Sequence, residues 1–111
     1  RRDYWNTISG DDLPAPLALV TFDAAVNSGV HRASKWLQRA VQAYTDGVIG
    51  PLTIKGAVAA YNESPYACVE RCCDYRLEFI RSLRTYETFG RGWERRIQET
   101  REEALEWIET S

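Results

Sequence analysis

Residues 13–26 are the longest apolar stretch of this 111-residue chain, interrupted only by Thr21 and Asp23. Prolines at positions 14 and 16 suit the first turn of a helix, where a missing N–H costs nothing. Asn27-Ser28-Gly29 then supplies a helix-ending signal. The stretch is shorter than the roughly 20 residues that a membrane span needs. We therefore expect a helix that is apolar on nearly every side and lies at the centre of the fold.

Four further segments carry apolar residues at helical spacings, and no segment favours a strand. They are expected at Val30–Tyr44, from Pro51 to about Tyr61, at Ser64–Leu83 and at Trp93–Ile108, the last preceded by a loop around residues 88–92. With 44% apolar residues the chain can bury a core. The sequence predicts a single all-α domain of about five helices over residues 1–111.

The net charge of this chain argues against a general nucleic-acid-binding protein. The formal net charge is -2, whereas a general nucleic-acid binder carries a basic surface. The second expected helix does have a polar side, to which the periodicity assigns Arg32, Lys35, Gln38 and Arg39. No basic recognition helix stands out, so we expect no nucleic-acid partner.

The run from Asp46 to Thr53, Asp-Gly-Val-Ile-Gly-Pro-Leu-Thr, predicts a tight turn that leads into a helix. Gly47 and Gly50 allow backbone angles that cost other residues more, and Pro51 suits the first helical position. The apolar Val48 and Ile49 are expected to attach the turn to the core. Taken alone, the run is a turn followed by a helix start.

Three cysteines, Cys68, Cys72 and Cys73, lie within six residues of one expected helix. An odd, clustered number is a poor disulfide framework for a secreted domain. A metal site needs further ligands, and His31, the only histidine, is far away in sequence. We expect small buried thiols, no metal or other cofactor, and synthesis in a reducing cytoplasm.

Asp23 is the first candidate site residue, because a carboxylate in so apolar a segment must be hydrogen-bonded or have a raised pKa. Asn27 lies four residues on, on the same helix face. Asp23 could work with Asn27 in a cleft, or it could be a structural carboxylate that holds backbone N–H groups of a neighbouring loop. His31 follows the helix end and could face the same cleft or be an exposed neighbour of the next helix start.

Aromatic residues near the start of the chain form a second candidate site. Tyr4 and Trp5, beside Asn6, could stack on the apolar faces of sugar rings, or Trp5 could simply close the core. The other tryptophans lie on amphipathic helices and are expected to be packing residues.

No residue of this sequence stands out as a general acid or a general base. Asp11 and Asp12 precede Leu13-Pro14, which helix capping alone explains. Ser28 lacks a G-x-S-x-G context and a histidine–carboxylate partnership. Glycoside cleavage needs a proton donor at the leaving oxygen, and no residue has the local signature of one.

Several segments, taken in order, resemble glycoside hydrolase family 108, the lysozyme-like endolysins and secretion activators of phages and Gram-negative bacteria. These segments are Tyr4-Trp5, Gly10 to Pro14, Phe22 to Gly29, Ala33 with Lys35 to Ala40, Asp46 to Thr53, Arg76-Leu77 and Phe89 to Trp93. The resemblance covers nearly the whole chain and corresponds to the family's C-terminal portion, often described as a peptidoglycan-binding domain. It implies a lysozyme-like helical fold.

The chain departs from the family at the catalytic residue. The family's catalytic glutamate lies in an E-G-G-Y motif near its N-terminus, followed by a D-P-G-G-type segment. Neither occurs here, and no glutamate precedes Glu63. We therefore expect no catalytic residue in this chain. The start at Arg1-Arg2, where the family would still be inside its helical body, favours a truncated chain over a short form that never had the motif.

For the complete protein the resemblance implies a muramidase that cuts the glycan between N-acetylmuramic acid and N-acetylglucosamine. It implies synthesis in the cytoplasm of a Gram-negative host or its phage, and action on murein in the periplasm. Asp23, Asn27, Trp5, Tyr4 and His31 are the expected substrate-binding residues. The turn residues Asp46, Gly47, Gly50 and Thr53 resemble those of small peptidoglycan-binding modules.

Two functions remain open at this point. The chain could be the C-terminal part of a peptidoglycan hydrolase, inactive unless a missing N-terminal segment or second chain supplies the glutamate. It could instead be a module that binds murein or a protein partner and cleaves nothing. Both explain why the glutamate motif is absent.

Overall fold

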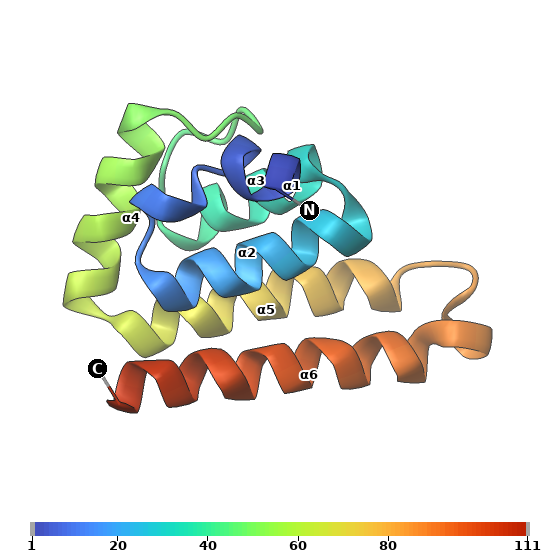
Figure 1. Ribbon diagram of the computed structural model, residues 1–111. Helices are drawn as coiled ribbons and strands as arrows, with labels where there is room; N and C mark the ends of the chain where they lie inside the picture. Colours follow the sequence, from blue (N-terminus) through green and yellow to red (C-terminus); the bar gives the residue numbers. More distant parts are fainter. Residues whose placement is uncertain (1, 111) are drawn as a thin grey trace.

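The central element of the fold is the apolar helix α2 (Ala15–Ser28). The computed structural model describes residues 2–110; Arg1, at which the sequence begins, and Ser111 lie outside the described residues. Helix α2 buries residues along most of its circumference, among them Leu17, Val20 and Ala24. It packs against α1, α3, α5 and α6, as Figure 1 shows. The predicted central position is therefore confirmed.

The remaining elements are also helical. They are α1 (Arg2–Thr7), the 3-10 helix η1 (Gly10–Asp12), α3 (Val30–Ala40), α4 (Pro51–Glu63), α5 (Pro65–Arg81) and α6 (Tyr86–Thr110). Residues 2–110 contain no β-strand, which confirms the predicted all-α class. Within the same residues, no helix is long and apolar enough to cross a membrane.

The helix boundaries follow local signals at several of the predicted places, including the start of α4 at Pro51. Helix α2 ends where Gly29 adopts a φ of 96°, a conformation that favours glycine, and its N–H donates to the carbonyl of Ala25 at 2.9 Å. Helix α5 begins at Pro65, as predicted, with Ser64 at the N-cap position. The Ser64 side chain makes no capping hydrogen bond, so proline geometry rather than a hydroxyl cap marks this start.

The first residues of the chain were not predicted to be helical, and that expectation was incomplete. Helix α1 and η1 both pack against α2. Asp11 and Asp12 lie inside η1 and do not cap α2, which has Pro14 at its N-cap position. The Asp11 carboxylate instead accepts a hydrogen bond from the Trp5 indole N–H at 2.9 Å.

Helix α3 is shorter than the apolar pattern suggested. It ends at Ala40, and Tyr44, taken as the last apolar member of the pattern, is 83% exposed. Gln38, assigned to the polar side, is fully buried. Helical periodicity misplaced both residues, because the segment that follows α3 folds back over Gln38.

Helices α5 and α6 form an antiparallel pair, and both helices pack against α2 (Figure 1). Arg101 bridges from α6 to Glu70 and Asp74 on α5, and Arg81 bridges back to Glu94. Between the two helices and α2 lie the apolar side chains of Val69, Leu77 and Ile97.

The expected loop around residues 88–92 does not exist, because these residues lie within α6. Two glycines suggested a break, yet Gly90 is buried and the Tyr86 ring lies over it. The Tyr86 hydroxyl donates to Glu94 at 2.8 Å, and Glu94 also pairs with Arg81. These contacts with side chains one turn away and on α5 offset the low helix propensity of glycine.

Candidate functional site

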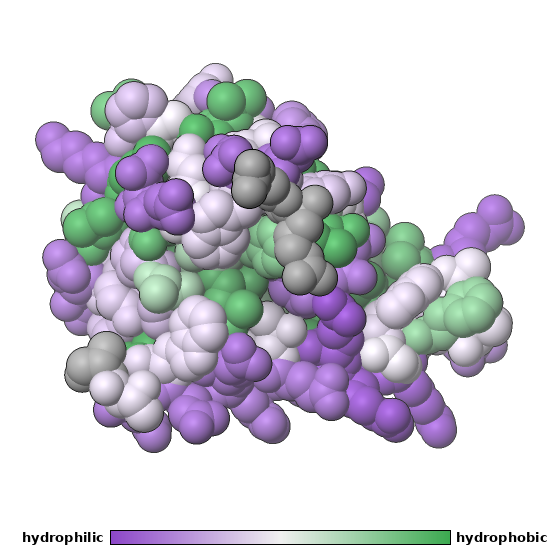
Figure 2. Space-filling view, viewed as in Figure 1, coloured by the Kyte–Doolittle hydropathy of each residue, from purple (hydrophilic) through white to green (hydrophobic). Residues whose placement is uncertain are grey.

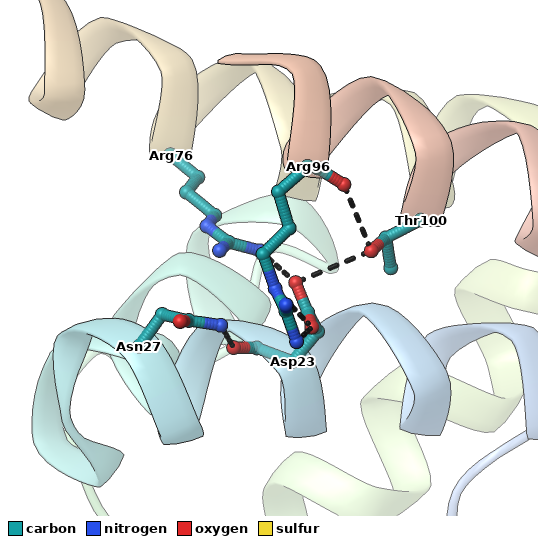
Figure 3. Close-up of polar contacts among 5 residues, drawn as sticks. All are labelled: Asp23, Asn27, Arg76, Arg96 and Thr100. Atoms are coloured by element: carbon teal, nitrogen blue, oxygen red, sulfur yellow. Dashed lines mark hydrogen bonds and ion pairs between the residues drawn. The ribbon is translucent and has the colours of Figure 1, made fainter. Parts of the chain in front are cut away.

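Asp23 lies on α2 at the centre of a polar cluster that three helices build (Figure 3). One carboxylate oxygen, Oδ2, accepts hydrogen bonds from Nη1 of Arg76 at 2.7 Å and from the Thr100 hydroxyl at 3.2 Å. The other, Oδ1, accepts from Nε and Nη2 of Arg96 at 3.1 and 2.8 Å. Of the two alternatives that the sequence left for this carboxylate, the structure shows the hydrogen-bonded one.

The two arginines differ in their exposure to solvent. The Arg76 side chain comes from α5 and is 6% exposed, whereas the Arg96 side chain comes from α6 and is 56% exposed. Asp23 is therefore the counter-charge of a buried guanidinium and of a more exposed one. In a low-dielectric interior such pairing is needed to keep a buried charge.

Sequence reasoning did not identify Arg76, Arg96 or Thr100 as partners of Asp23. They lie 53, 73 and 77 residues further along the chain. Arg76-Leu77 was noted only as part of a family pattern. A buried arginine on an otherwise apolar helix face was the available signal that an acidic partner exists elsewhere.

A pocket of about 440 Å³ opens beside this cluster. The ends of α2, α3, α5 and α6 contribute its lining, which comprises Asn27, Ser28, Arg32, Arg76, Phe79, Ile80, Leu83, Trp93 and Arg96. In the space-filling view the α5–α6 end stands out from the body of the molecule (Figure 2). The volume is in the range of sites for small organic ligands.

The pocket has cationic groups on an apolar floor. Arg32 lies with its guanidinium carbon 4.2 Å from the centre of the Phe79 ring, and its Nη1 donates to the Ser28 carbonyl at 3.1 Å. Together with Arg76 and Arg96 it places three positive charges around the pocket. Among the described residues that line it, none is acidic.

Asn27 lines this pocket, whereas Asp23 is not among the lining residues. The Asn27 side-chain amide donates to the Asp23 carbonyl at 2.8 Å, which holds the side chain at the helix end. The structure thus brings the two residues together but gives them different positions. Asp23 contacts side chains of α5 and α6, and not the backbone N–H groups of a loop, as the structural interpretation had supposed.

Tyr4 and Trp5 are not among the residues that line the pocket. The Trp5 ring packs edge-on against Phe22, with centroids 5.6 Å apart, and its indole N–H is bonded to Asp11. A Cβ atom at Gly10 would lie 2.3 Å from the Trp5 ring, so the tight approach requires glycine there. Trp5 occupies the core-closing position, and Tyr4 beside it is 38% exposed.

His31 lies at the start of α3 and contacts the Asp46 turn. A Cβ atom at Gly47 would lie 2.2 Å from the imidazole ring, and Gly47 has a φ of 82°. His31 also borders a second, open pocket with Ser28 and Lys35. It is exposed and does not line the pocket that contains Asn27.

The turn between α3 and α4 is organised by Gln38, which sequence reasoning missed. Its amide nitrogen has two N–H groups, which are shared among three acceptors: Oδ1 of Asp46 at 2.9 Å, the Val48 carbonyl at 3.0 Å and the Thr53 hydroxyl at 3.0 Å. Its amide oxygen accepts from the Gly47 N–H at 2.9 Å. One fully buried side chain therefore satisfies four groups of the turn.

Of the two residues expected to attach this turn to the core, only one is buried. Ile49 is buried, but Val48 is 67% exposed. The Val48 N–H donates to Asp46 at 3.0 Å. This backbone hydrogen bond, together with the one from Gln38, holds the pKa of the Asp46 carboxyl below its usual value.

The three thiols are buried and free, as expected. Burial raises the pKa of all three, and that of Cys73 reaches about 11. Within residues 2–110 no group of three or more metal-ligating side chains gathers.

Comparison with known proteins gives two findings. Residues 1–29 match the sequence pattern of the family described as Glycosyl hydrolase 108. The structure of Brucella abortus SagA is similar, with a TM-score of 0.84 and 40% sequence identity over 92% of this chain. The match covers 57% of that chain, so the present sequence spans little more than half of it. No curated protein sequence matches this chain.

Proposed function

Because this chain is related to glycoside hydrolase family 108, we propose that it is the C-terminal part of a lysozyme-like peptidoglycan hydrolase. In this proposal residues 1–111 form one helical lobe that binds murein and completes the substrate cleft. The observation that carries the proposal is the 40% identity to SagA over 92% of the chain, together with the family match at residues 1–29.

The proposed substrate is the glycan of murein, and the bond cleaved by the complete protein is the muramidase bond. Action would follow in the periplasm, after synthesis in a Gram-negative host or its phage. The pocket beside Asn27 supports a binding role, because it is concave, partly apolar and equipped with hydrogen-bond donors. Asp23 contributes by positioning Arg76 and Arg96 at the edge of that pocket.

The other residues expected to bind substrate have minor or structural roles in the proposed function. Tyr4 is available for contact with a sugar ring, while Trp5 supports it from the core. His31 would contact ligand only through the second pocket. We assign Asp46, Gly47, Gly50 and Thr53 a structural role, since Asp46, Gly47 and Thr53 are bonded to buried Gln38.

We further propose that this chain supplies no proton donor. Glycoside hydrolysis needs a carboxylic acid placed at the leaving oxygen, commonly one with a raised pKa. The family's E-G-G-Y motif does not occur in the sequence, and Asp23, the buried acid, has both oxygens engaged by arginines. A missing N-terminal segment or second chain would bring the glutamate.

A murein assay tests the proposal in two parts. The chain should co-sediment with purified murein, but the turbidity of the murein suspension should not fall. Asn27→Ala should weaken co-sedimentation severalfold, because it removes a polar group from the pocket. Asn62→Ala, an exposed change on α4, should leave it unaltered. Measurable lysis would refute the missing donor, and a chain that stays in the supernatant would refute murein binding.

A second candidate is a module that binds murein or a protein and cleaves nothing. The absence of an acid among the described pocket-lining residues fits this alternative equally well. The reading frame upstream of Arg1 distinguishes the two. An encoded E-G-G-Y segment fits the hydrolase, and a native start near Arg1 fits the module.

A further inference from the structure

One donor of a pocket-lining arginine has no partner among the described residues. The Nε of Arg76 is buried and makes no hydrogen bond among the described residues, although the side chain is only 6% exposed and lines the pocket. Buried polar groups are nearly always paired, so an orphaned donor on a buried charge needs an explanation. Arg76 also lines a small inner cavity beside Thr21, whose buried hydroxyl likewise has no partner among the described residues, so this donor is not counted toward the pocket.

The charges around the pocket are unbalanced. Asp23 offers one negative charge to the two guanidiniums of Arg76 and Arg96. Arg32 is held by a carbonyl and an aromatic ring and pairs with no carboxylate among the described residues. The lining therefore carries three positive charges against a single buried negative one, an arrangement suited to an anion.

The rest of the lining constrains the anion further. Phe79, Ile80, Leu83 and Trp93 provide apolar walls, and the volume of about 440 Å³ exceeds what a simple ion fills. The pocket thus suits an organic molecule with an acidic group and an aliphatic part. Arg32, stacked on Phe79, presents a pre-oriented fork of donors at its rim.

We propose that this pocket binds the carboxylates of the acidic stem peptide of murein, with Arg32, Arg76 and Arg96 as the recognising groups. The inference rests on the proposed function and makes it more specific. Where a stem peptide is attached, the lactyl carboxyl group of the sugar is tied up in an amide, so the free carboxylates belong to the peptide. Peptide methyl and methylene groups would contact the apolar walls.

The test measures the dissociation constants of four probes by calorimetry. They are the free stem peptide, the same peptide with its carboxylates converted to amides, a peptide-bearing disaccharide, and glycan strands stripped of peptide whose newly exposed lactyl carboxylates have been converted to amides. The two acidic, peptide-bearing probes should bind through the pocket. The amidated peptide should bind at least tenfold more weakly, because it cannot form charge-assisted hydrogen bonds.

A matched pair of variants locates the site. Arg32→Gln should weaken binding of the free stem peptide roughly tenfold. Arg39→Gln is its control, since Arg39 lies on the same helix and over a ring, that of Tyr75 at 4.3 Å, but outside the pocket. Both side chains are exposed, so both variants should fold, which a thermal melt verifies.

The outcomes separate the inference from the proposed function. Equal affinity for the acidic and amidated peptides, or equal effects of the two variants, overturns the inference. Binding of stripped glycan without binding of stem peptide also overturns it, yet supports the proposed function. Binding of stem peptide but not of stripped glycan supports the inference and counts against glycan recognition. A chain that binds none of the four probes overturns both.

Discussion

At the scale of single residues, Asp23 is the centre of a network of interhelical hydrogen bonds. Its carboxylate joins α2 to α5 and α6 through Arg76, Arg96 and Thr100. The contact with the buried Arg76 dominates energetically, because Arg96 is 56% exposed and solvent screens that pair. Asp23, for which the sequence left a cleft role and a structural role open, thus links three helices.

Asp23→Asn should destabilise the fold by about 3 kcal/mol, since it leaves the buried Arg76 guanidinium without a counter-charge. Urea denaturation monitored by circular dichroism measures the loss. Asp12→Asn, an exposed change in η1, should alter the free energy of unfolding by less than about 0.5 kcal/mol. Equal, small effects of the two substitutions would show that Asp23 is not a structural link.

At the scale of elements, α6 shows how packing decides a helix that propensity disfavours. Gly90 and Gly92 lie two residues apart in the same helix but in different surroundings. A Cβ atom at Gly90 would lie 2.1 Å from the Tyr86 ring, whereas one at Gly92 would meet no atom within 4 Å. The first glycine is required by a contact and the second is not.

This pair gives a prediction with opposite signs. Gly92→Ala should stabilise the protein by about 0.5–1 kcal/mol, the helix propensity difference between the two residues. Gly90→Ala should destabilise it, because the ring of Tyr86 must move and its bond to Glu94 is disturbed. Thermal melts of the two variants side by side make the comparison, and a stabilised Gly90→Ala would disprove the packing argument.

The turn between α3 and α4 is an element of another kind, held by side-chain hydrogen bonds. Asp46 accepts hydrogen bonds from Val48 and Gln38, which lower the pKa of its carboxyl in the folded state. A lowered folded-state pKa means that the stabilising contribution is present above the unfolded value of 3.8. It is lost as the pH falls through the folded-state value.

Asp46→Asn should therefore be less stable than the parent chain at neutral pH, and the difference should shrink as the pH falls below about 4. Urea midpoints of both proteins between pH 7 and pH 2.5 give the difference directly. Comparing the two proteins cancels the protonation of other acids. A difference that stays constant over this range would show that the Asp46 charge contributes nothing to the turn.

At the scale of the whole molecule, one core joins α2, α3, α5 and α6, and the three thiols belong to it. Cys68, Cys72 and Cys73 are each buried. Burial raises the pKa of the Cys72 thiol well above its usual value and that of Cys73 to about 11. The thiolate is the reactive form, so native thiols should be inert at ordinary pH.

We expect a thiol reagent at pH 8 to modify the three cysteines only after global unfolding. The reaction rate should rise steeply with urea through the unfolding transition, since the helices that bury the thiols open together. Fully unfolded protein is the control and should react at once. Fast modification of any thiol in the native protein would show that α5 opens locally.

Local signals in the sequence were enough for the all-α class, the central α2 and the starts of α4 and α5, because apolar periodicity, proline and glycine act over a few residues. They did not predict that Gln38 and Arg76 are buried, or that Gly90 lies within a helix. A polar residue at a helical position is exposed unless a distant segment covers it, and periodicity does not show which segment comes near.

The sequence by itself therefore determined the helices and, through ordered motifs, indicated the resemblance to glycoside hydrolase family 108, with which the match at residues 1–29 and the similarity to SagA agree. Tertiary structure alone decided the site. Asp23 meets arginines 53 and 73 residues away, and the pocket forms where four helix ends converge. Hydrogen bonds within helices are local, whereas the pairing of buried charges depends on which helices pack together.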